Sequence, residues 1–213
     1  MKPGSITAIA GLIAALTSYQ TFAGAYDDFM RAVMQDRAPL VRQLLTKGVD
    51  VNTTDANGNS ALALAIREGN REVLDVLLKA GAKPDIQNKY GETPLMLAAI
   101  KGDKPTVLRL LAAGAGVKQP GWNALIYAAT NGHDDLVRLL LERGADVNSV
   151  SENGTSALMM AARGGYKEAV LTLLEYGANI DQRTSSNGTA LGWAMDAGHQ
   201  EIGELLIKAG ATN

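Results

Sequence analysis

A chain of 213 residues, 46% of them hydrophobic, is long enough for one domain or a modest repeat array and apolar enough to form a packed core, which argues against intrinsic disorder. Its 20 lysines and arginines and 22 aspartates and glutamates are mixed along the chain and leave a formal charge of −2, so no basic face for nucleic acid is expected. The chain has no cysteine, which excludes disulfides, thiolate zinc sites and cysteine nucleophiles.

Residues 1–25 have the pattern of an export signal. Lys2 precedes an apolar run over residues 6–16, and small residues follow at Ala23 and Ala25. We predict a signal peptide cleaved after Ala23 or Ala25, and therefore a secreted or periplasmic protein. The run has 11 residues, whereas spanning a bilayer takes roughly 20, so no stable membrane anchor is expected. The alternative is a first helix that is buried or lies at an interface.

The rest of the chain is organised by glycines that recur with a fixed period. One series, spaced 33, 33, 30, 33 and 33 residues apart, comprises Gly48, Gly81, Gly114, Gly144, Gly177 and Gly210. A second series with the same period comprises Gly69, Gly102, Gly132, Gly165 and Gly198. Apolar residues before the first series lie on one helical face, and a glycine suits the left-handed residue that ends a helix. The pattern predicts repeated units of two helices.

The motifs within these units are specific. The clearest are Gly91-Glu92-Thr93-Pro94-Leu95, Ala98-Ala99, Gly102, Gly114-Ala115 and Gly144-Ala145-Asp146-Val147-Asn148. In these segments the chain resembles the ankyrin-repeat family, and the resemblance extends over about residues 26–213. It implies an all-α solenoid of stacked helix-turn-helix units with short hairpin fingers. The small residues of the first helices allow neighbouring helices to approach closely.

The period also predicts the boundaries of the units. Residues 26–54 are expected to form an N-terminal capping helix pair, with Tyr26, Phe29, Val33 and Met34 on its apolar side, because an open-ended stack requires a cap. Five repeats over residues 55–213 follow. Their predicted bounds are 55–87, 88–117, 118–150, 151–183 and 184–213.

Three departures from the family pattern have structural consequences. The family's Thr-Pro-Leu-His motif lacks its histidine in every unit; Met96, Ile126 and Met159 stand there in the second, third and fourth. The third finger is three residues short, so we expect an irregular finger and a notch, although loops tolerate such deletions. Gly203 occupies a helix interior, where it costs about 1 kcal/mol relative to alanine.

No set of catalytic or metal-binding residues is found in the sequence. There is no Gly-Lys dipeptide for a phosphate loop and no Gly-x-Ser-x-Gly motif. His133 and His199 occupy equivalent positions two units apart, roughly 20 Å from one another if stacked helices are spaced by about 8–10 Å, so they cannot share a metal. Asp134 and Asp135 open a helix and complement its dipole. We therefore expect no enzyme activity, cofactor or metal.

What remains is a binding surface. The resemblance implies that the finger tips and the exposed side of the first helices form a concave face that binds another protein. On this basis the predicted contact residues are Tyr90, Trp122, Lys101, Asn131, Arg163, Lys89, Arg67, Glu92 and Glu152. The alternative for Trp122 is that it folds over the gap left by the shortened finger. Tyr127 and Trp193 replace leucines or methionine of other units and are expected to pack in the interior.

The sequence thus predicts a secreted or periplasmic, monomeric protein that binds one or more partner proteins and catalyses nothing. Two narrower roles remain open within that prediction. The chain could be an immunity protein that neutralises a co-encoded secreted toxin, or an accessory factor of an envelope stress enzyme. Outside it, the alternatives are a hydrolase that uses exposed carboxylates such as Glu92 and Glu152, and a structural tether that self-associates.

Overall fold

A computed structural model describes residues 24–212. The predicted signal peptide lies outside the described residues, apart from Gly24 and Ala25 at the start of a helix. The chain divides into two compact units, Met1–Lys89 and Tyr90–Asn213. Every regular element within the described residues is a helix, and β-structure there is limited to two isolated bridges, Thr54 with Ser60 and Val150 with Ser156. The predicted all-α class is confirmed.

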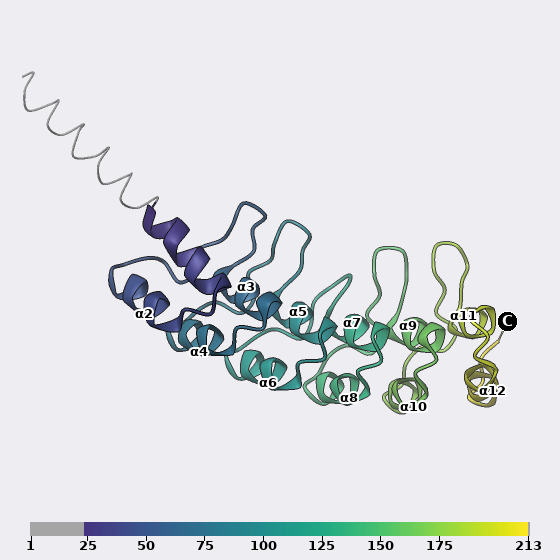
Figure 1. Cartoon of the computed structure of the whole chain (residues 1–213). Helices are drawn as coiled ribbons and strands as arrows, with labels where there is room; N and C mark the ends of the chain where they lie inside the picture. The colour runs from purple at the N-terminus through teal and green to yellow at the C-terminus, as the bar shows by residue number, and fades with distance from the viewer. Residues whose placement is uncertain (1–23, 213) are drawn as a thin grey trace, which may run out of the picture. The chain divides into compact units, whose positions relative to one another are not determined.

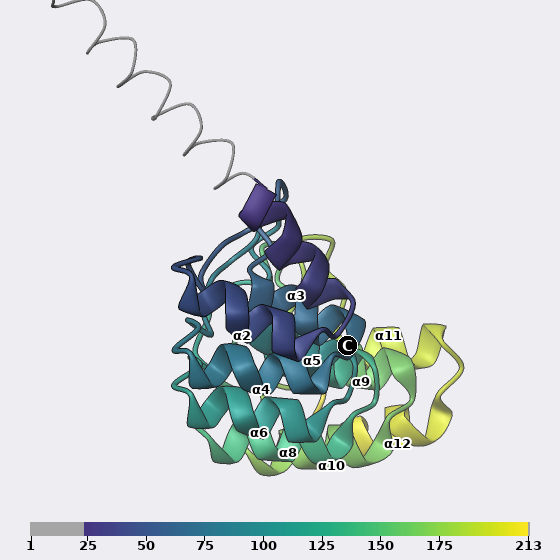
Figure 2. The ribbon, with the colours of Figure 1, turned by 60° about the vertical axis from the view of Figure 1, so that its left-hand side comes forward.

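The first unit begins with a helix over residues 24–34, which packs through the buried Phe29 and Val33. Met34 was expected on the same apolar side but is 48% exposed. The helix over 24–34 is followed by α2 (Ala38–Thr46), α3 (Ala61–Glu68) and α4 (Arg71–Lys79), and Figure 2 shows α2 lying beside α4. The Nδ2 atom of Asn70, just before α4, donates to the carbonyls of Val33 and Met34 and so closes the C-terminus of the first helix.

The second unit consists of four helix pairs. Its helices are α5 (Pro94–Ile100), α6 (Lys104–Ala112), α7 (Ala124–Thr130), α8 (Asp134–Glu142), α9 (Ala157–Gly164), α10 (Lys167–Glu175), α11 (Ala190–Asp196) and α12 (Gln200–Lys208). We call α5, α7, α9 and α11 the first-row helices and α6, α8, α10 and α12 the second-row helices; Figure 1 shows the two rows, with the loops that form the fingers projecting beyond the first. Each predicted repeat range in this unit contains one helix of each row.

Small residues set the spacing of the first-row helices. Ala98, Ala128 and Ala161 are fully buried where α5, α7 and α9 contact one another. The second-row helices instead bury branched residues such as Val107, Leu136 and Leu173 against their first-row partners. Burying a side chain of this size contributes about 1.5–3 kcal/mol, so the solenoid is stabilised mainly by contacts between neighbouring helices.

Every first helix starts at a side-chain cap. The capping oxygens, which accept the backbone N–H three residues ahead, belong to Ser60, Thr93, Asn123, Ser156 and Thr189. In two units the methionine that replaces the family histidine adds a contact, because Met96 Sδ accepts the N–H of Thr93 and Met159 Sδ accepts that of Ser156, each at 3.5 Å. A thioether is a weak acceptor, so the lost imidazole is only partly replaced.

Aromatic rings link neighbouring repeats at the start of the second-row helices. His133, the N-cap residue of α8, places Nε2 3.1 Å from the carbonyl oxygen of Ile100 in the preceding repeat. Gly102 lies directly beneath this ring; it has a φ of +68°, and an added Cβ would lie 2.6 Å from the imidazole. The ring of His199 meets Gly165 in the same way. Both histidines are therefore packing residues at the start of a second helix.

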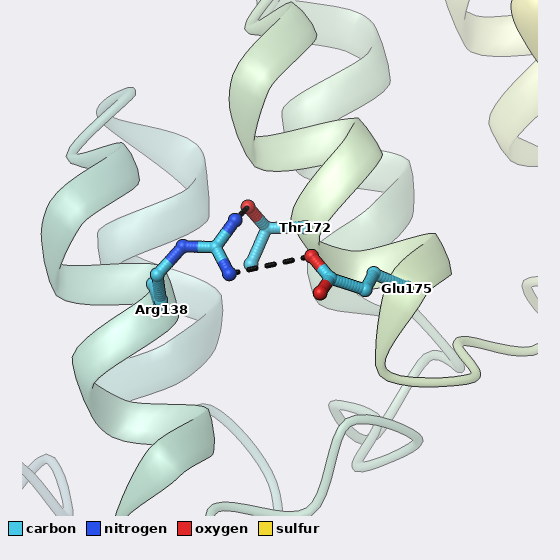
Figure 3. Close-up of polar contacts among 3 residues, drawn as sticks. All are labelled: Arg138, Thr172 and Glu175. Carbon is cyan, nitrogen blue, oxygen red and sulfur yellow. Dashed lines mark hydrogen bonds and ion pairs between the residues drawn. The ribbon is translucent and has the colours of Figure 1, made fainter.

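Exposed ion pairs join the second-row helices along the stack. Figure 3 shows Arg138 of α8, whose guanidinium lies 3.3 Å from the Glu175 carboxylate and donates to Thr172 Oγ1 at 2.9 Å, both residues being on α10. Lys104 pairs similarly with Asp135, and Lys167 with Glu201. Each exposed pair contributes only about 0–1 kcal/mol. No helix within the described residues combines the length and the apolar character needed to cross a membrane.

Candidate protein-binding surface

The fingers differ in how they are closed. The fourth finger is a hairpin in which the N–H of Ser151 donates to the carbonyl of Thr155, and in the fifth the N–H of Thr184 donates to that of Gly188. In the third finger the side chain of Asn123 replaces such a bond, because its Nδ2 donates to the carbonyls of Gln119 and Gly121. The loop before α7 is visibly shorter than those before α9 and α11 (Figure 1), as the missing three residues predicted.

Two aromatic side chains are exposed at the second and third fingers. Tyr90 is 79% exposed and Trp122 is 39% exposed. Trp122 also packs on Tyr127 of α7, with ring centroids 5.3 Å apart and an interplanar angle of 36°. Trp122 thus packs on Tyr127 and still presents part of its ring, and its role as a contact residue stays a prediction. Tyr127 is only half-buried, so it is not the interior residue that we expected.

The Glu92 carboxylate acts on the Trp122–Tyr127 pair. Burial raises the pKa of the Tyr127 hydroxyl, and the negative charge of Glu92 raises it further, which places the Glu92 carboxylate within electrostatic reach of the phenol. Glu152 lies exposed on the fourth finger. Tryptophan, tyrosine and arginine are the residues that most often dominate the energetics of protein interfaces.

The predicted polar contact residues of the first-row helices lie where those helices end. Lys101 and Asn131 are the C-cap residues of α5 and α7, and Arg163 is in the last turn of α9. All three are exposed, and the three helices are neighbours in the stack. Asn131 is partly engaged, because its Nδ2 donates to the carbonyl of Tyr127 at 2.9 Å.

Two predicted contact residues, Arg67 and Lys89, belong to the first unit. Arg67 is held in place, because its guanidinium donates to Asn59 Oδ1 at 2.8 Å. Asn59 is buried and bonded in turn to Asp55 and Asn88. Burial alone would raise the pKa of Asp55, but hydrogen bonds from the side chain and backbone of Asn59, together with the charge of Arg67, lower it below the ordinary value. Arg67 therefore supports the base of its finger.

Trp193 on α11 does not lie where its repeat position predicts. It was expected in the interior, but it is half-buried and lines a hollow of about 510 Å³ together with Arg163, Asp196 and Ala197. The guanidinium carbon of Arg163 lies 5.7 Å from the centroid of the indole. The available signal was Gly188, because other fingers have a larger residue at that position.

The acidic pair at the start of α8 consists of Asp134, which is half-buried, and the exposed Asp135. The pKa of Asp134 is raised, first by burial and then by the charge of Glu168, against a backbone hydrogen bond from Ala169. Its Oδ1 atom is buried without a hydrogen-bond partner, so the helix-dipole benefit that we expected is opposed by desolvation. Within the described residues, no group of three His, Asp or Glu side chains is placed to hold a metal ion.

Comparison with known proteins decides the family. A family model described as ankyrin repeats (3 copies) matches residues 29–119, 72–151 and 143–213. The chain belongs to the ankyrin-repeat family. Ankyrin repeats form protein-binding modules, and their fold is generally a non-catalytic scaffold.

Among solved structures, an ankyrin-repeat domain from Acinetobacter baumannii AYE is similar, with a TM-score of 0.78 and 31% identity over 86% of this chain and 98% of that one. A chain of the complex between a predatory endopeptidase of Bdellovibrio bacteriovorus and an immunity protein has a TM-score of 0.75 and 26% identity, covering 85% of this chain and 97% of that one.

Curated relatives share only part of their length with this chain. The human transient receptor potential cation channel subfamily A member 1 is 30% identical over 49% of this chain but only 10% of its own length. The Schizosaccharomyces pombe glycerophosphocholine phosphodiesterase gde1 is 38% identical over 44% of this chain and 9% of its own. The similarity to these proteins therefore concerns a short segment of each.

Proposed function

We propose that this protein is an exported, monomeric binding module without catalytic activity, which captures a partner protein through its finger tips and first-row helices. The observation that supports this most directly is the exposure of two aromatic side chains, Tyr90 on the second finger and Trp122 on the shortened third finger. Helices flank the fingers that carry these side chains, so binding should require little ordering of the backbone. The export signal pattern over residues 1–25 supports a periplasmic or secreted location.

Inhibition of a secreted enzyme is the narrower role that a specific observation favours. The similarity to a chain of the endopeptidase–immunity protein complex extends over nearly all of that chain, and the ankyrin fold is common to both. An immunity protein of this kind would cover its target with the finger side of the stack. The other narrower role, an accessory factor of an envelope stress enzyme, predicts a partner whose activity is unchanged or increased by binding.

Affinity capture from the native envelope fraction tests the proposal, with Trp122→Ala as the site variant. We expect loss of the indole to weaken binding of the partner by more than about 1 kcal/mol. The free energy of unfolding should change by about as much as it does in the control variant. Tyr176→Ala is a matched control, because Tyr176 is 38% exposed, close to the 39% of Trp122, but caps the second-row helix α10. Equal capture by both variants would show that the finger side is not the binding surface.

The activity of the captured protein then distinguishes the roles. An immunity protein should abolish hydrolysis by its target when mixed with it in equal amounts. An accessory factor should leave catalysis intact. A different result would be that the purified chain alone turns over a substrate, with the rate reduced by Glu92→Gln or Glu152→Gln. That result would favour the alternative of a hydrolase that uses exposed carboxylates.

A further inference from the structure

The hollow between α9 and α11 presents a cation at a fixed place. Arg163 lies in the last turn of α9 and Trp193 in the middle of α11, two helices that pack directly against one another. With the guanidinium carbon 5.7 Å from the indole centroid, Arg163 lies over the ring in a cation–π contact. This contact restricts the rotamers of the arginine without using its N–H donors in hydrogen bonds.

The fifth finger makes room for this arrangement. Gly188 forms the base of that finger, and a Cβ atom added there would lie 2.5 Å from Trp193 Nε1. The equivalent residues in the first and fourth repeats are Asn59 and Thr155, which have larger, buried side chains. The glycine therefore lets the indole lie against the finger base and hold the arginine of the preceding repeat.

The surroundings of the Arg163 donors differ from those of the Arg67 donors. Within the described part of the chain, the Arg163 guanidinium takes part in no hydrogen bond or ion pair, and the indole is its one recorded partner. The equivalent Arg67 donates to Asn59, whereas the fourth repeat has Thr155, whose hydroxyl is already bonded to Asn153 Oδ1. A guanidinium that is oriented but unpaired is suited to bind a carboxylate through two parallel hydrogen bonds.

We propose that this hollow receives the side chain of a glutamate or aspartate of the partner protein, a proposal that rests on the proposed protein-binding function. The carboxylate pairs with the two-pronged edge of the Arg163 guanidinium, and the aliphatic part of the acidic side chain fills the space beside Trp193 and Ala197. Asp196 is the other charged group that lines the hollow, and it lies beyond ion-pair distance of Arg163. Its negative charge weakens the binding of an anion, so its removal should strengthen it.

Blocked tripeptides test the proposal on the folded full chain. The three probes are acetyl-Ala-Glu-Ala-amide, acetyl-Ala-Gln-Ala-amide and acetyl-Ala-Gln-Ala with a free carboxyl terminus, and the readout is the NMR shift of the Trp193 indole N–H and the Arg163 Nε–H. We expect the glutamate peptide to shift both signals in a saturable way and to bind about tenfold more tightly than the blocked glutamine peptide. Tighter binding of the peptide with the free terminus would overturn the assignment to a side chain.

Variants distinguish the effect of the paired guanidinium donors from the effect of the positive charge alone. Arg163→Lys retains the charge but loses the paired donors, so it should bind the glutamate peptide several-fold more weakly. Asp196→Asn should bind it more tightly, and Arg67→Lys should bind it as the unchanged protein does, because Arg67 is engaged with Asn59. Unchanged affinity in Arg163→Lys, or weaker affinity in Asp196→Asn, would overturn the proposal.

The experiments distinguish an error in the carboxylate site from an error in the proposed binding surface. If capture of the partner depends on Trp122 but not on Arg163, and no peptide shifts the Trp193 signal, only the carboxylate site is wrong. If the glutamate peptide binds at Arg163 and captured proteins are indifferent to both residues, the site exists but the proposed binding surface is wrong.

Discussion

Arg67 and Arg163 occupy the same position of two repeats, and the surrounding finger gives each a different role. Arg67 donates to the buried Asn59 and belongs to the scaffold. Arg163 has Thr155 in place of that asparagine and lies over Trp193 of the next repeat, with its donors available. We infer that the residue at the finger base determines whether an arginine on a first helix is structural or available for binding.

The most disruptive way to break this comparison is Asn59→Thr, which gives the first finger the residue of the fourth. Threonine cannot serve Asp55, Arg67 and Asn88 together, so a buried network loses several hydrogen bonds. We expect the free energy of unfolding to fall by about 2–3 kcal/mol, measured by urea denaturation. A loss below about 0.5 kcal/mol would mean that Arg67 is not part of the scaffold.

Gly188→Thr tests the other side of the comparison. The added side chain meets Trp193 Nε1 and the Thr184 hydroxyl at the finger base, so the indole must leave its place under the finger. We expect a destabilisation of about 1–3 kcal/mol by overpacking, and loss of glutamate-peptide binding because Arg163 loses its support. Gly192→Ala is the control with a milder contact, because an added Cβ there lies 3.3 Å from its nearest neighbour, Thr189 Oγ1, compared with 2.5 Å from Trp193 Nε1 at Gly188.

Thr155→Asn should convert the fourth repeat to the arrangement of the first. An asparagine at this position can accept from Arg163 as Asn59 accepts from Arg67. We expect a gain of about 0.5–1.5 kcal/mol in unfolding free energy if the new bond forms, with weaker binding of the glutamate peptide. The Arg163 Nε–H signal reports the change directly. An unaltered signal would show that more than the finger residue separates the two arginines.

The smallest expected effects are those of pH. The pKa of Asp55 is lowered in the folded protein, so its contribution to stability is present above the ordinary value of 3.8 and is lost as the pH falls through the folded value. The pKa of Asp134 is raised, so folding gains stability as the pH falls through that raised value towards 3.8. Urea denaturation at a series of pH values should show Asp55→Asn to be destabilised at pH 7 and Asp134→Asn to be stabilised. The reverse order at pH 7 would contradict both assignments.

Much of the fold follows from residues near one another in the sequence. The glycine series, the capping residues before each first helix and the apolar offsets of the second helices predicted the helix pairs and the irregular third finger. The exposure of Tyr90, Lys101 and Arg163 agrees with the resemblance to ankyrin repeats. Trp193 was misplaced, because repeat position predicts the environment only when the neighbouring repeat has ordinary residues. Met34 was misplaced, because apolar spacing within the first helix does not show which neighbours cover its last turn.

The sequence by itself determined the repeat, its period and the face on which variable side chains stand, because helix capping, left-handed glycines and apolar spacing act within about ten residues. Only the tertiary structure decided which of those side chains are engaged. Arg67 and Asn59, or Arg163 and Trp193, are brought together by a finger folding over a helix or by one repeat packing on the next. Such contacts depend on the volume left by a third residue, as Gly188 shows, and local pattern does not record that volume.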